Sequence, residues 1–209
     1  MQGSELNPMN ESLRRGILSR RIKKLLLIFW ILLVPWEGTI TGWKTCASSD
    51  TDPAAKFQEY QLKAAFIYNF AKFIEWPPSS FQDEGSPFIV GILGKDPFGE
   101  ALAVIQGKKV GKRDIAVKHF DRLDSLGKCH ILYISASEKD RLQKIFKMTE
   151  KGKALTISDF SGFCQAGGNI NFFIEEKRVR FEINLDSAQR NGLKISSQLL
   201  KLSKIVREE

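Results

Sequence analysis

The segment from Tyr60 to Pro78 is apolar for most of its length and ends in two prolines. Its apolar side chains recur every three or four residues, which is typical of a helix with a buried face. Proline disfavours helix at the residue before it, so Pro77 and Pro78 should end this helix. At about 17 residues, with charges, the segment is too short and too polar to cross a membrane, which takes roughly 20 apolar residues. It therefore predicts a core helix. The expected inward residues are Leu62, Phe66, Phe70 and Phe73, flanked by Ala64, Ile67, Tyr68, Ala71 and Ile74, with Lys63, Asn69, Lys72 and Glu75 as polar interruptions.

A short apolar run at residues 25–36 follows a cluster of arginines and lysines. A basic stretch before a short apolar run is typical of a secretory signal, and this run is too short to span a bilayer. Small residues come next, so we expect cleavage close to residue 47 and before residue 54. An uncleaved signal anchor is the alternative. Lipidation at Cys46 is disfavoured by the residues that precede it.

The rest of the chain predicts one domain. With 209 residues, 43% of them hydrophobic, the chain can build one core but hardly two. We therefore divide it into a signal segment at 1–47, a flexible mature start at 48–56 and a single α/β domain at 57–209. The formal charge of +8 falls to +4 without the signal segment, since 25 basic and 21 acidic residues remain. This balance indicates a solvated surface and argues against nucleic-acid binding.

Predicted strands alternate with predicted helices and are followed by a hairpin. Such spacing is typical of a largely parallel sheet covered on both faces. We expect a three-layer α/β domain: a mostly parallel central sheet of about six strands, helices on both faces and a C-terminal antiparallel hairpin. The expected strands are 88–93, 114–120, 130–135 and 154–158, with the hairpin at 169–184. Three further helices are expected: one that begins near Pro97, one at 137–152 and one at 195–206.

Motifs that carry catalysis or metal binding do not occur in the sequence. Both histidines, His119 and His130, fall on predicted strands without a cysteine or carboxylate pattern beside them, so we interpret them as structural. Gly94 and Gly99 lie between a strand and a helix, as in phosphate-binding loops, but the GxGxxG and P-loop patterns are absent. We expect no catalytic residue, no metal and no cofactor.

The loop from Asp159 to Asn169 is the first candidate binding segment. It carries Phe160 and Phe163 and closes on two glycines. Aromatic side chains in a loop are frequent anchors for a partner protein, and are about as often plugs of the core. We take Asp159, Phe160, Phe163 and Asn169 as candidate partner-binding residues.

A row of polar residues on the predicted hairpin is the second candidate. Arg180 and Glu182 alternate with apolar residues and so share one face of a strand. With Glu75 at the end of the first helix, they are candidates to line a groove for a small ligand. The alternative is a solvated face with internal ion pairs.

Cys129 and Cys164 are the cysteines that remain after the signal segment. An oxidising compartment permits them to pair, whereas Cys129 beside an apolar strand is equally typical of a buried free thiol. A core of this size does not need a bridge, so we expect no essential disulfide.

Several segments together resemble the YfiR-like periplasmic proteins, over about residues 57–206. They are Trp76-Pro77 at the end of the aromatic helix, ILGKDPFG, CHILYIS, TISDF with its double glycine, RVRFEIN and GLKISSQLLKLS. The resemblance implies an α/β regulator without enzymatic activity. Such a protein restrains a membrane-bound diguanylate cyclase by binding its periplasmic sensor region, and its release raises cyclic di-GMP and favours biofilm.

The resemblance also implies frequent homodimers and redox control through cysteines, for which this sequence has few cysteines. The expected partner is thus a membrane diguanylate cyclase, with no nucleic acid and no stable membrane insertion after cleavage. The alternative function is a periplasmic sensor that binds a small ligand and feeds a membrane partner. An apolar surface near Phe160 and Phe163 would favour the first function. A closed pocket lined by Glu75, Arg180 and Glu182 would favour the second.

Overall fold

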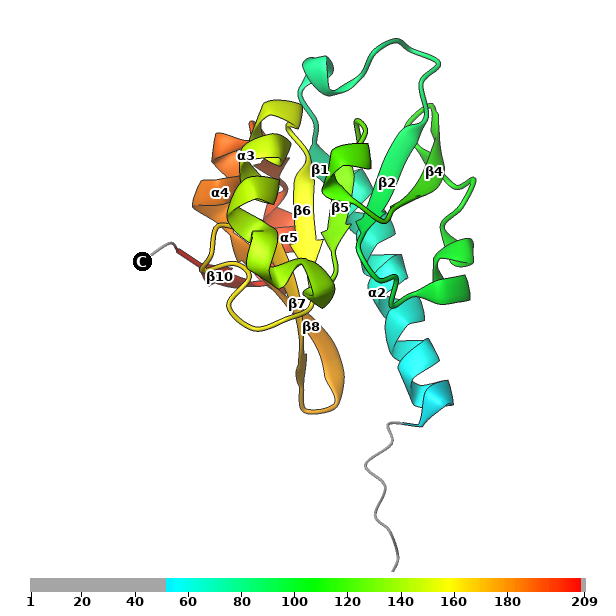
Figure 1. Cartoon of the computed structure of the whole chain (residues 1–209), viewed down its shortest axis with the longest axis vertical. Helices are drawn as coiled ribbons and strands as arrows, with labels where there is room; N and C mark the ends of the chain where they lie inside the picture. The colour runs from blue at the N-terminus through cyan, green and yellow to red at the C-terminus, as the bar shows by residue number, and fades with distance from the viewer. Residues whose placement is uncertain (1–51, 208–209) are drawn as a thin grey trace, which may run out of the picture. The chain divides into compact units, whose positions relative to one another are not determined.

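The computed structural model of the chain describes residues 52–207 (Figure 1). These residues belong to one compact unit, Ser49–Glu209. The predicted signal segment at 1–47 and its cleavage site lie outside the described residues. Within residues 52–207 no helix is long and apolar enough to cross a membrane.

An eight-stranded sheet forms the centre of the domain, in the order β10-β8-β7-β6-β5-β2-β4-β3. Five of its seven neighbouring pairs are parallel; β7 with β8 and β3 with β4 are antiparallel. The expected mostly parallel sheet with a C-terminal hairpin is therefore confirmed. The strands are β2 (Phe88–Leu93), β3 (Lys109–Val110), β4 (Arg113–Phe120), β5 (Ile131–Ile134), β6 (Leu155–Ser158), β7 (Ile170–Glu175), β8 (Arg178–Asn184) and β10 (Lys204–Val206).

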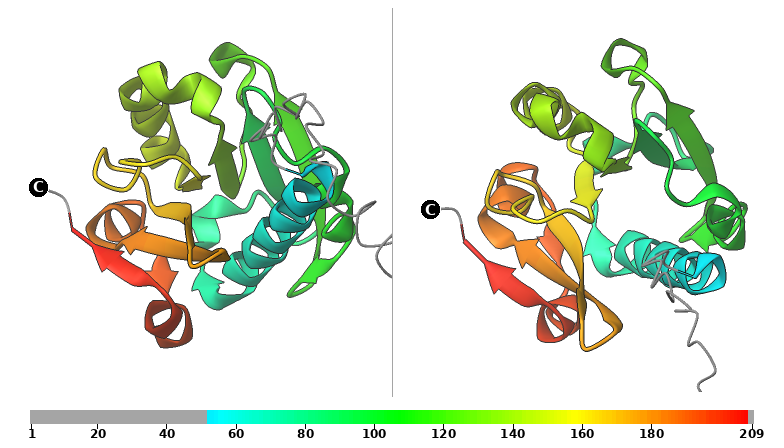
Figure 2. Two further views of the ribbon diagram at one scale, coloured as in Figure 1. Left: turned by 90° about the horizontal axis from the view of Figure 1, so that it is seen from below. Right: turned by 60° about the horizontal axis from the view of Figure 1, so that its bottom comes forward.

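Helices cover both faces of this sheet, as expected. The long helix α2 (Pro53–Phe73) lies on one face and α3 (Leu142–Gly152) on the other (Figure 2). Side chains of the central strands alternate between two cores. Phe88, Val90 and Ile92 of β2 join the core under α2, whereas Leu93 joins the core under α3. The remaining elements are α4 (Leu185–Arg190), α5 (Ser197–Leu202), a small antiparallel pair of β1 (Ile74–Glu75) and β9 (Lys194–Ile195), and the 3-10 helices η2 (Pro78–Ser80), η3 (Gly99–Val104), η4 (Leu123–Ser125) and η5 (Ala136–Arg141).

The buried face of α2 differs from the predicted one. The helix begins at Pro53, where the Asp52 side chain accepts a hydrogen bond from the Ala54 amide, and it ends at Phe73. Leu62 and Phe73 were expected inside but are 46% and 38% exposed. The apolar residues of this helix cover more than one face, and the sheet buries only one stripe of the helix. That stripe comprises Tyr60, Lys63, Ala64, Ile67, Phe70 and Ala71.

Three other segments depart from expectation. The segment after Pro97 forms a 3-10 helix, and α4 was not predicted. The last expected helix stops at Leu202, after which β10 pairs with β8. Three residues form a strand there because the sheet supplies their hydrogen-bonding partner. Within the expected hairpin, the chain turns at Glu176 and Lys177, which are both at positive φ.

Candidate functional site

The carboxyl ends of β2, β5, β6 and β7 meet at one edge of the sheet, because these strands are parallel. The loops after them, the turn of the β7–β8 hairpin and the first half of α2 lie at this edge (Figure 1). In sheets of this kind, ligands and partners usually bind where the carboxyl ends of strands meet. We call this region the carboxyl edge.

Asp159 lies directly after β6 and joins the loop to α2. Its carboxylate accepts hydrogen bonds from Lys63 Nζ at 2.7 Å and from the Tyr60 hydroxyl at 2.9 Å. Lys63 Nζ also lies 2.6 Å from Glu59 Oε1. Burial by itself raises the pKa of the Asp159 carboxyl, but the Lys63 ammonium outweighs it and holds that pKa below its ordinary value. Asp159 is therefore ionised and bound within the protein.

The same carboxylate acts on two tyrosines of this cluster. Burial and the charge of Asp159 raise the pKa of Tyr60 and of Tyr133 above the ordinary value. The Tyr133 hydroxyl is buried close to the Asp159 carboxylate. Lys63 was interpreted from sequence as a polar interruption of the helix, but it is the buried cation that compensates Asp159.

Phe163 is a core residue and does not reach the surface. Its side chain is fully buried, with its ring centroid 5.7 Å from that of Phe146 and 5.4 Å from that of Phe160. A Cβ at Gly168 would collide with the Phe163 ring, so the second glycine of the pair gives this ring its space. Phe160 is half-buried and carries Lys139 Nζ 5.7 Å above its ring. Of the two rings, only Phe160 is available to a partner.

Asn169 is also buried and holds the loop from within. Its Oδ1 accepts hydrogen bonds from the Thr156 amide at 2.8 Å and from the Thr156 hydroxyl at 3.0 Å. Its Nδ2 donates to Ser187 Oγ at 2.8 Å, and Asn191 Nδ2 donates to its Oδ1 at 3.2 Å. Asn169 thus connects β6, the loop and α4, and the structure gives it no exposed surface for a partner.

Glu75, Arg180 and Glu182 are not brought together. Glu75 is exposed on β1 and lies 3.7 Å from Lys194 Nζ. Arg180 lies 3.8 Å from Glu175, and buried Glu182 accepts a hydrogen bond from Asn171. Glu75 follows α2, whereas the backbone carbonyl of Glu182 accepts a hydrogen bond from the buried Cys164 thiol at 3.8 Å. Arg180 and Glu182 share one face of β8, as the sequence predicted. Glu75 does not form a groove with them.

Cys129 and Cys164 are both free and buried. Cys129 precedes β5 and Cys164 follows β6, so these two residues lie at opposite edges of the parallel sheet. Burial raises the pKa of Cys129 to about 12 and also raises that of Cys164. Neither thiol is a reactive thiolate at neutral pH.

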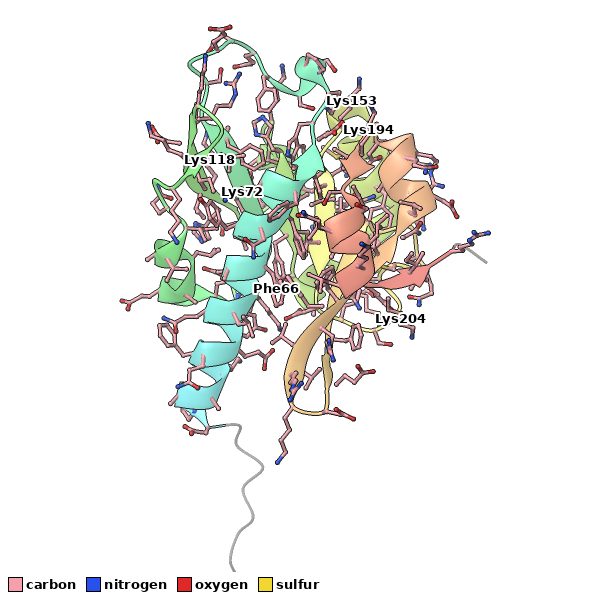
Figure 3. The ribbon with its side chains drawn as sticks, turned by 180° about the vertical axis from the view of Figure 1, so that it is seen from behind. Phe66, Lys72, Lys118, Lys153, Lys194 and Lys204 are labelled. Carbon is pink, nitrogen blue, oxygen red and sulfur yellow. The ribbon has the colours of Figure 1, made fainter. Side chains whose placement is uncertain are left out.

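An apolar groove lies between α2 and the hairpin turn. It has a volume of about 650 Å³ and is bordered by Leu62 on α2 and by Ile174 and Val179 on the hairpin. Leu62 is 46% exposed and Ile174 is 52% exposed, so both present apolar surface to water. The neighbouring Phe66 packs on Phe172 and Phe181 and joins helix to hairpin from within (Figure 3). The other residues of the groove are Ala55, Gln58, Glu59, Lys177 and Arg178. We call it the hairpin groove.

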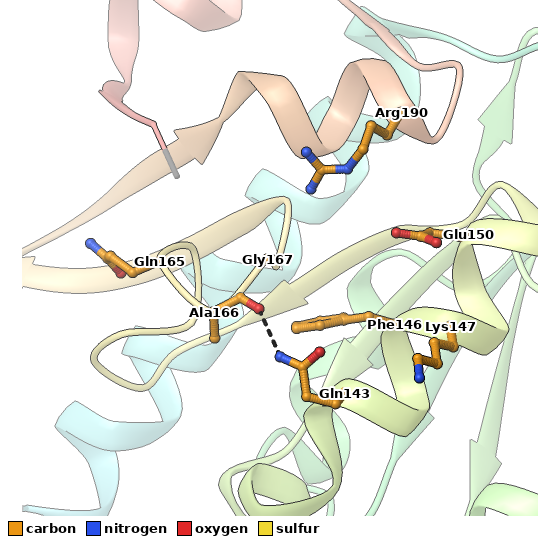
Figure 4. Close-up of a pocket in the computed structure, with 8 residues that line it drawn as sticks. All are labelled: Gln143, Phe146, Lys147, Glu150, Gln165, Ala166, Gly167 and Arg190. Atoms are coloured by element: carbon orange, nitrogen blue, oxygen red, sulfur yellow. Dashed lines mark hydrogen bonds between the residues drawn. The ribbon is translucent and has the colours of Figure 1, made fainter. Parts of the chain in front are cut away.

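A second, polar pocket of about 340 Å³ lies on the opposite face between α3, the loop and α4 (Figure 4). The Phe146 ring lies within it, and Gln143 Nε2 donates to the carbonyl of Ala166 at 3.5 Å. Its charged residues are Lys147, Glu150 and Arg190. No group of three or more histidine, cysteine, aspartate or glutamate residues within 52–207 has the arrangement of a metal site.

Two solved structures are similar to this chain at low sequence identity. A conserved domain protein from Vibrio cholerae O1 biovar El Tor has a TM-score of 0.51 and 8% identity, and the ABC domain from Streptococcus pneumoniae, solved in complex with L-Trp, has a TM-score of 0.49 and 9% identity. Each match covers 71% of this chain and 60% of the other. This chain therefore spans less than two thirds of the structures that it matches.

The sequence of the described domain also matches a family model, named DUF4154 and described as YfiR/HmsC-like, over residues 60–204. The match includes all strands of the sheet except the end of β10. The chain belongs to this YfiR/HmsC-like family.

Proposed function

We propose that this protein binds the periplasmic sensor region of a membrane diguanylate cyclase and restrains that enzyme. Membership of the YfiR/HmsC-like family supports a periplasmic regulatory role without catalysis of its own. Asp159 and Asn169 of the loop are hydrogen-bonded within the protein, which supports it as well. These two residues stabilise the fold and do not form a catalytic site.

The observation that carries the proposal is the hairpin groove. Its apolar floor is exposed, and its rim carries charges of both signs at Glu59, Lys177 and Arg178. An apolar centre inside a polar rim is the usual composition of a protein interface. Covering Leu62 and Ile174 would remove apolar surface from water, at about 25 cal/mol per Å².

The loop from Asp159 to Asn169 lies at the same edge and contributes less than expected from sequence. Phe163 and Asn169 are buried, so Phe160 is the ring that this loop can offer to the partner. We therefore propose the hairpin groove as the main contact and Phe160 as a marginal one. The homodimer implied by the family resemblance is a separate expectation, and light scattering of the purified protein tests it.

The test changes the groove without changing the core. Leu62→Glu and Ile174→Glu each place a charge on the exposed apolar floor. We expect both variants to stop co-purifying with the cyclase from solubilised membranes and to raise cellular cyclic di-GMP to the level of a deletion strain. Leu202→Glu is the matched control, because Leu202 is 65% exposed, lies on α5 and is not among the residues that border this groove. A folded Ile174→Glu variant that still binds and restrains the cyclase would refute the proposal.

A further inference from the structure

A separate cavity opens at the carboxyl edge, beside the first turns of α2, and the proposed function does not use it. Its volume is about 430 Å³. Aromatic rings, prolines and charged side chains line it together. They are Pro53, Lys56, Phe57, Tyr60, Asp96, Pro97, Phe98, Gly99 and Glu100.

The cavity lies beside the loop that leaves β2, where the path of the chain diverges. β2 has β4 on one side and β5 on the other. The chain after β2 packs η3 against α2, whereas the chain after β5 forms α3 on the other face. Parallel sheets bind small ligands at such a divergence. Gly94 lets the two loops meet here, because a Cβ at its φ of 85° would collide with Ser137 and Glu138.

Aromatic rings in the wall of this cavity stand nearly at right angles to one another. The Tyr60 and Phe98 centroids are 5.1 Å apart at 74°. Behind Phe98, the Tyr133 ring stands 4.7 Å away at 81°. Phe57 adds a third lining ring that is 42% exposed. Aromatic surfaces arranged at angles are the means by which proteins hold organic cations, because ring faces carry partial negative charge.

The charges of the cavity also favour a cation. Asp96 is fixed in place, since its Oδ1 accepts from the Phe98 amide at 2.8 Å and its Oδ2 lies 3.0 Å from His119 Nε2. Glu100 adds a second, exposed carboxylate. Lys56 is the one ammonium among the lining residues. Lys63, which is not one of them, lies with its Nζ 4.2 Å from the Tyr60 ring centroid and is paired with Asp159 and Glu59.

From these observations we propose that the cavity binds a small organic ammonium ion, which the exposed ring of Phe57 contacts over the largely buried rings of Tyr60 and Phe98 and which the carboxylates of Asp96 and Glu100 attract. The protein would thus have a binding site for a small molecule at the carboxyl edge, where the hairpin groove also lies. The binding does not depend on the proposed restraint of a cyclase. If choline binds while a folded Ile174→Glu variant still captures and restrains the cyclase, the proposed function fails and this site stands.

The test compares a cation with its neutral counterpart by isothermal titration calorimetry of the purified protein. Choline and 3,3-dimethyl-1-butanol have nearly the same shape, and only choline is charged. We expect saturable binding of choline and roughly 2- to 30-fold weaker binding of the alcohol, which is the range of cation–π attraction. Equal affinity for both compounds, or no saturable binding of choline, would overturn the proposal.

Two variants locate the binding. Phe57→Ala and Glu100→Gln change exposed side chains, so they should fold normally, and each should weaken choline binding about fivefold. Phe73→Ala, at the other end of the same helix, and Glu84→Gln, on an exposed loop outside the cavity, are the matched controls and should bind choline as the unmodified protein does. Choline affinity unchanged in Phe57→Ala and Glu100→Gln would place binding elsewhere and reject this site.

Discussion

Two segments at the carboxyl edge, the loop from Asp159 to Asn169 and the hairpin turn from Ile174 to Val179, have opposite roles. The loop is rich in aromatic and polar residues, yet its charge, its amide and one of its rings are bonded or buried inside the protein. The hairpin turn has no aromatic ring but exposes Ile174 next to Leu62. Residue type alone therefore does not identify a binding surface. A side chain is free to contact a partner protein only if the rest of the fold does not already bury it or bond it.

Phe163→Ala tests the buried side of this comparison and should have the largest effect. The fully buried ring leaves a cavity that Phe146 and Gly168 cannot fill, because both are fixed by neighbouring elements. We expect a loss of about 3–5 kcal/mol in the free energy of unfolding, measured by denaturant titration followed by circular dichroism. Phe160→Ala, at a half-buried ring, should cost clearly less. Equal losses for both variants would contradict the assignment of Phe163 alone to the core.

Lys63→Met should have the next largest effect. The change leaves the carboxylate of Asp159 without its ammonium, although the Tyr60 hydroxyl still donates to it. Removing one partner of a buried ion pair costs roughly 3 kcal/mol, at the low end of the usual range because Asp159 keeps this second bond. The double variant Lys63→Met with Asp159→Asn should recover part of the loss. Additive losses in the double variant would show that the two residues do not interact.

How far the sequence predicts the molecule depends on how local the deciding contact is. The bounds of β2 were predicted as observed, because a continuous apolar run is enough to mark a strand buried on both faces. Lys63 was misread because its partner Asp159 lies 96 residues away in the sequence. The burial of Phe163 depends on the packing of α3 against the loop, and β10 exists only through its pairing with β8. The hairpin groove likewise needs α2 and the hairpin side by side, which no local pattern reveals.

His130 extends the comparison to the amino edge of the sheet, where a buried polar ring also has a structural role. Its ring stacks on Phe81 and Phe88, and its Nδ1 accepts a hydrogen bond from the Ile89 amide at 2.9 Å. Burial, and then the positive charge of Arg113, lower the pKa of His130 to about 4. The folded state therefore favours the neutral ring.

This lowered pKa sets the direction of a pH dependence. Above pH 6.5 the ring is neutral in both the folded and the unfolded state, and the stability of the fold is fully present. As the pH falls from about 6.5 to about 4, the unfolded chain binds a proton that the folded chain resists, so stability falls. We expect a loss on the order of 2 kcal/mol across this window, after allowance for solvent screening at the edge of the sheet. Thermal melts at pH 7.0, 5.5 and 4.5 measure it.

Two variants connect the pH dependence to His130. His130→Asn keeps an acceptor for the Ile89 amide but does not titrate, so its stability should change less between pH 6.5 and pH 4. His119→Gln alters the exposed histidine on β4 and should keep the full dependence. If His119→Gln flattens the profile and His130→Asn does not, the titrating group is the exposed one.

Ile174→Ala should have the smallest effect on stability. It therefore tests most directly the difference between the exposed hairpin turn and the buried loop. Ile174 is exposed at the hairpin turn, so the truncation removes surface that the folded protein already leaves in water. Exposed substitutions of this kind change stability by about 0.5 kcal/mol or less, which a melting curve resolves against the several kcal/mol expected for Phe163→Ala. The same variant should weaken capture of the membrane partner, because it shortens the apolar floor of the hairpin groove. Leu202→Ala is the control, with a similar exposed aliphatic side chain on α5 and no expected loss of binding. If Ile174→Ala destabilised the fold as strongly as Phe163→Ala does, the hairpin turn would be part of the core, and the contrast between the two segments would not hold.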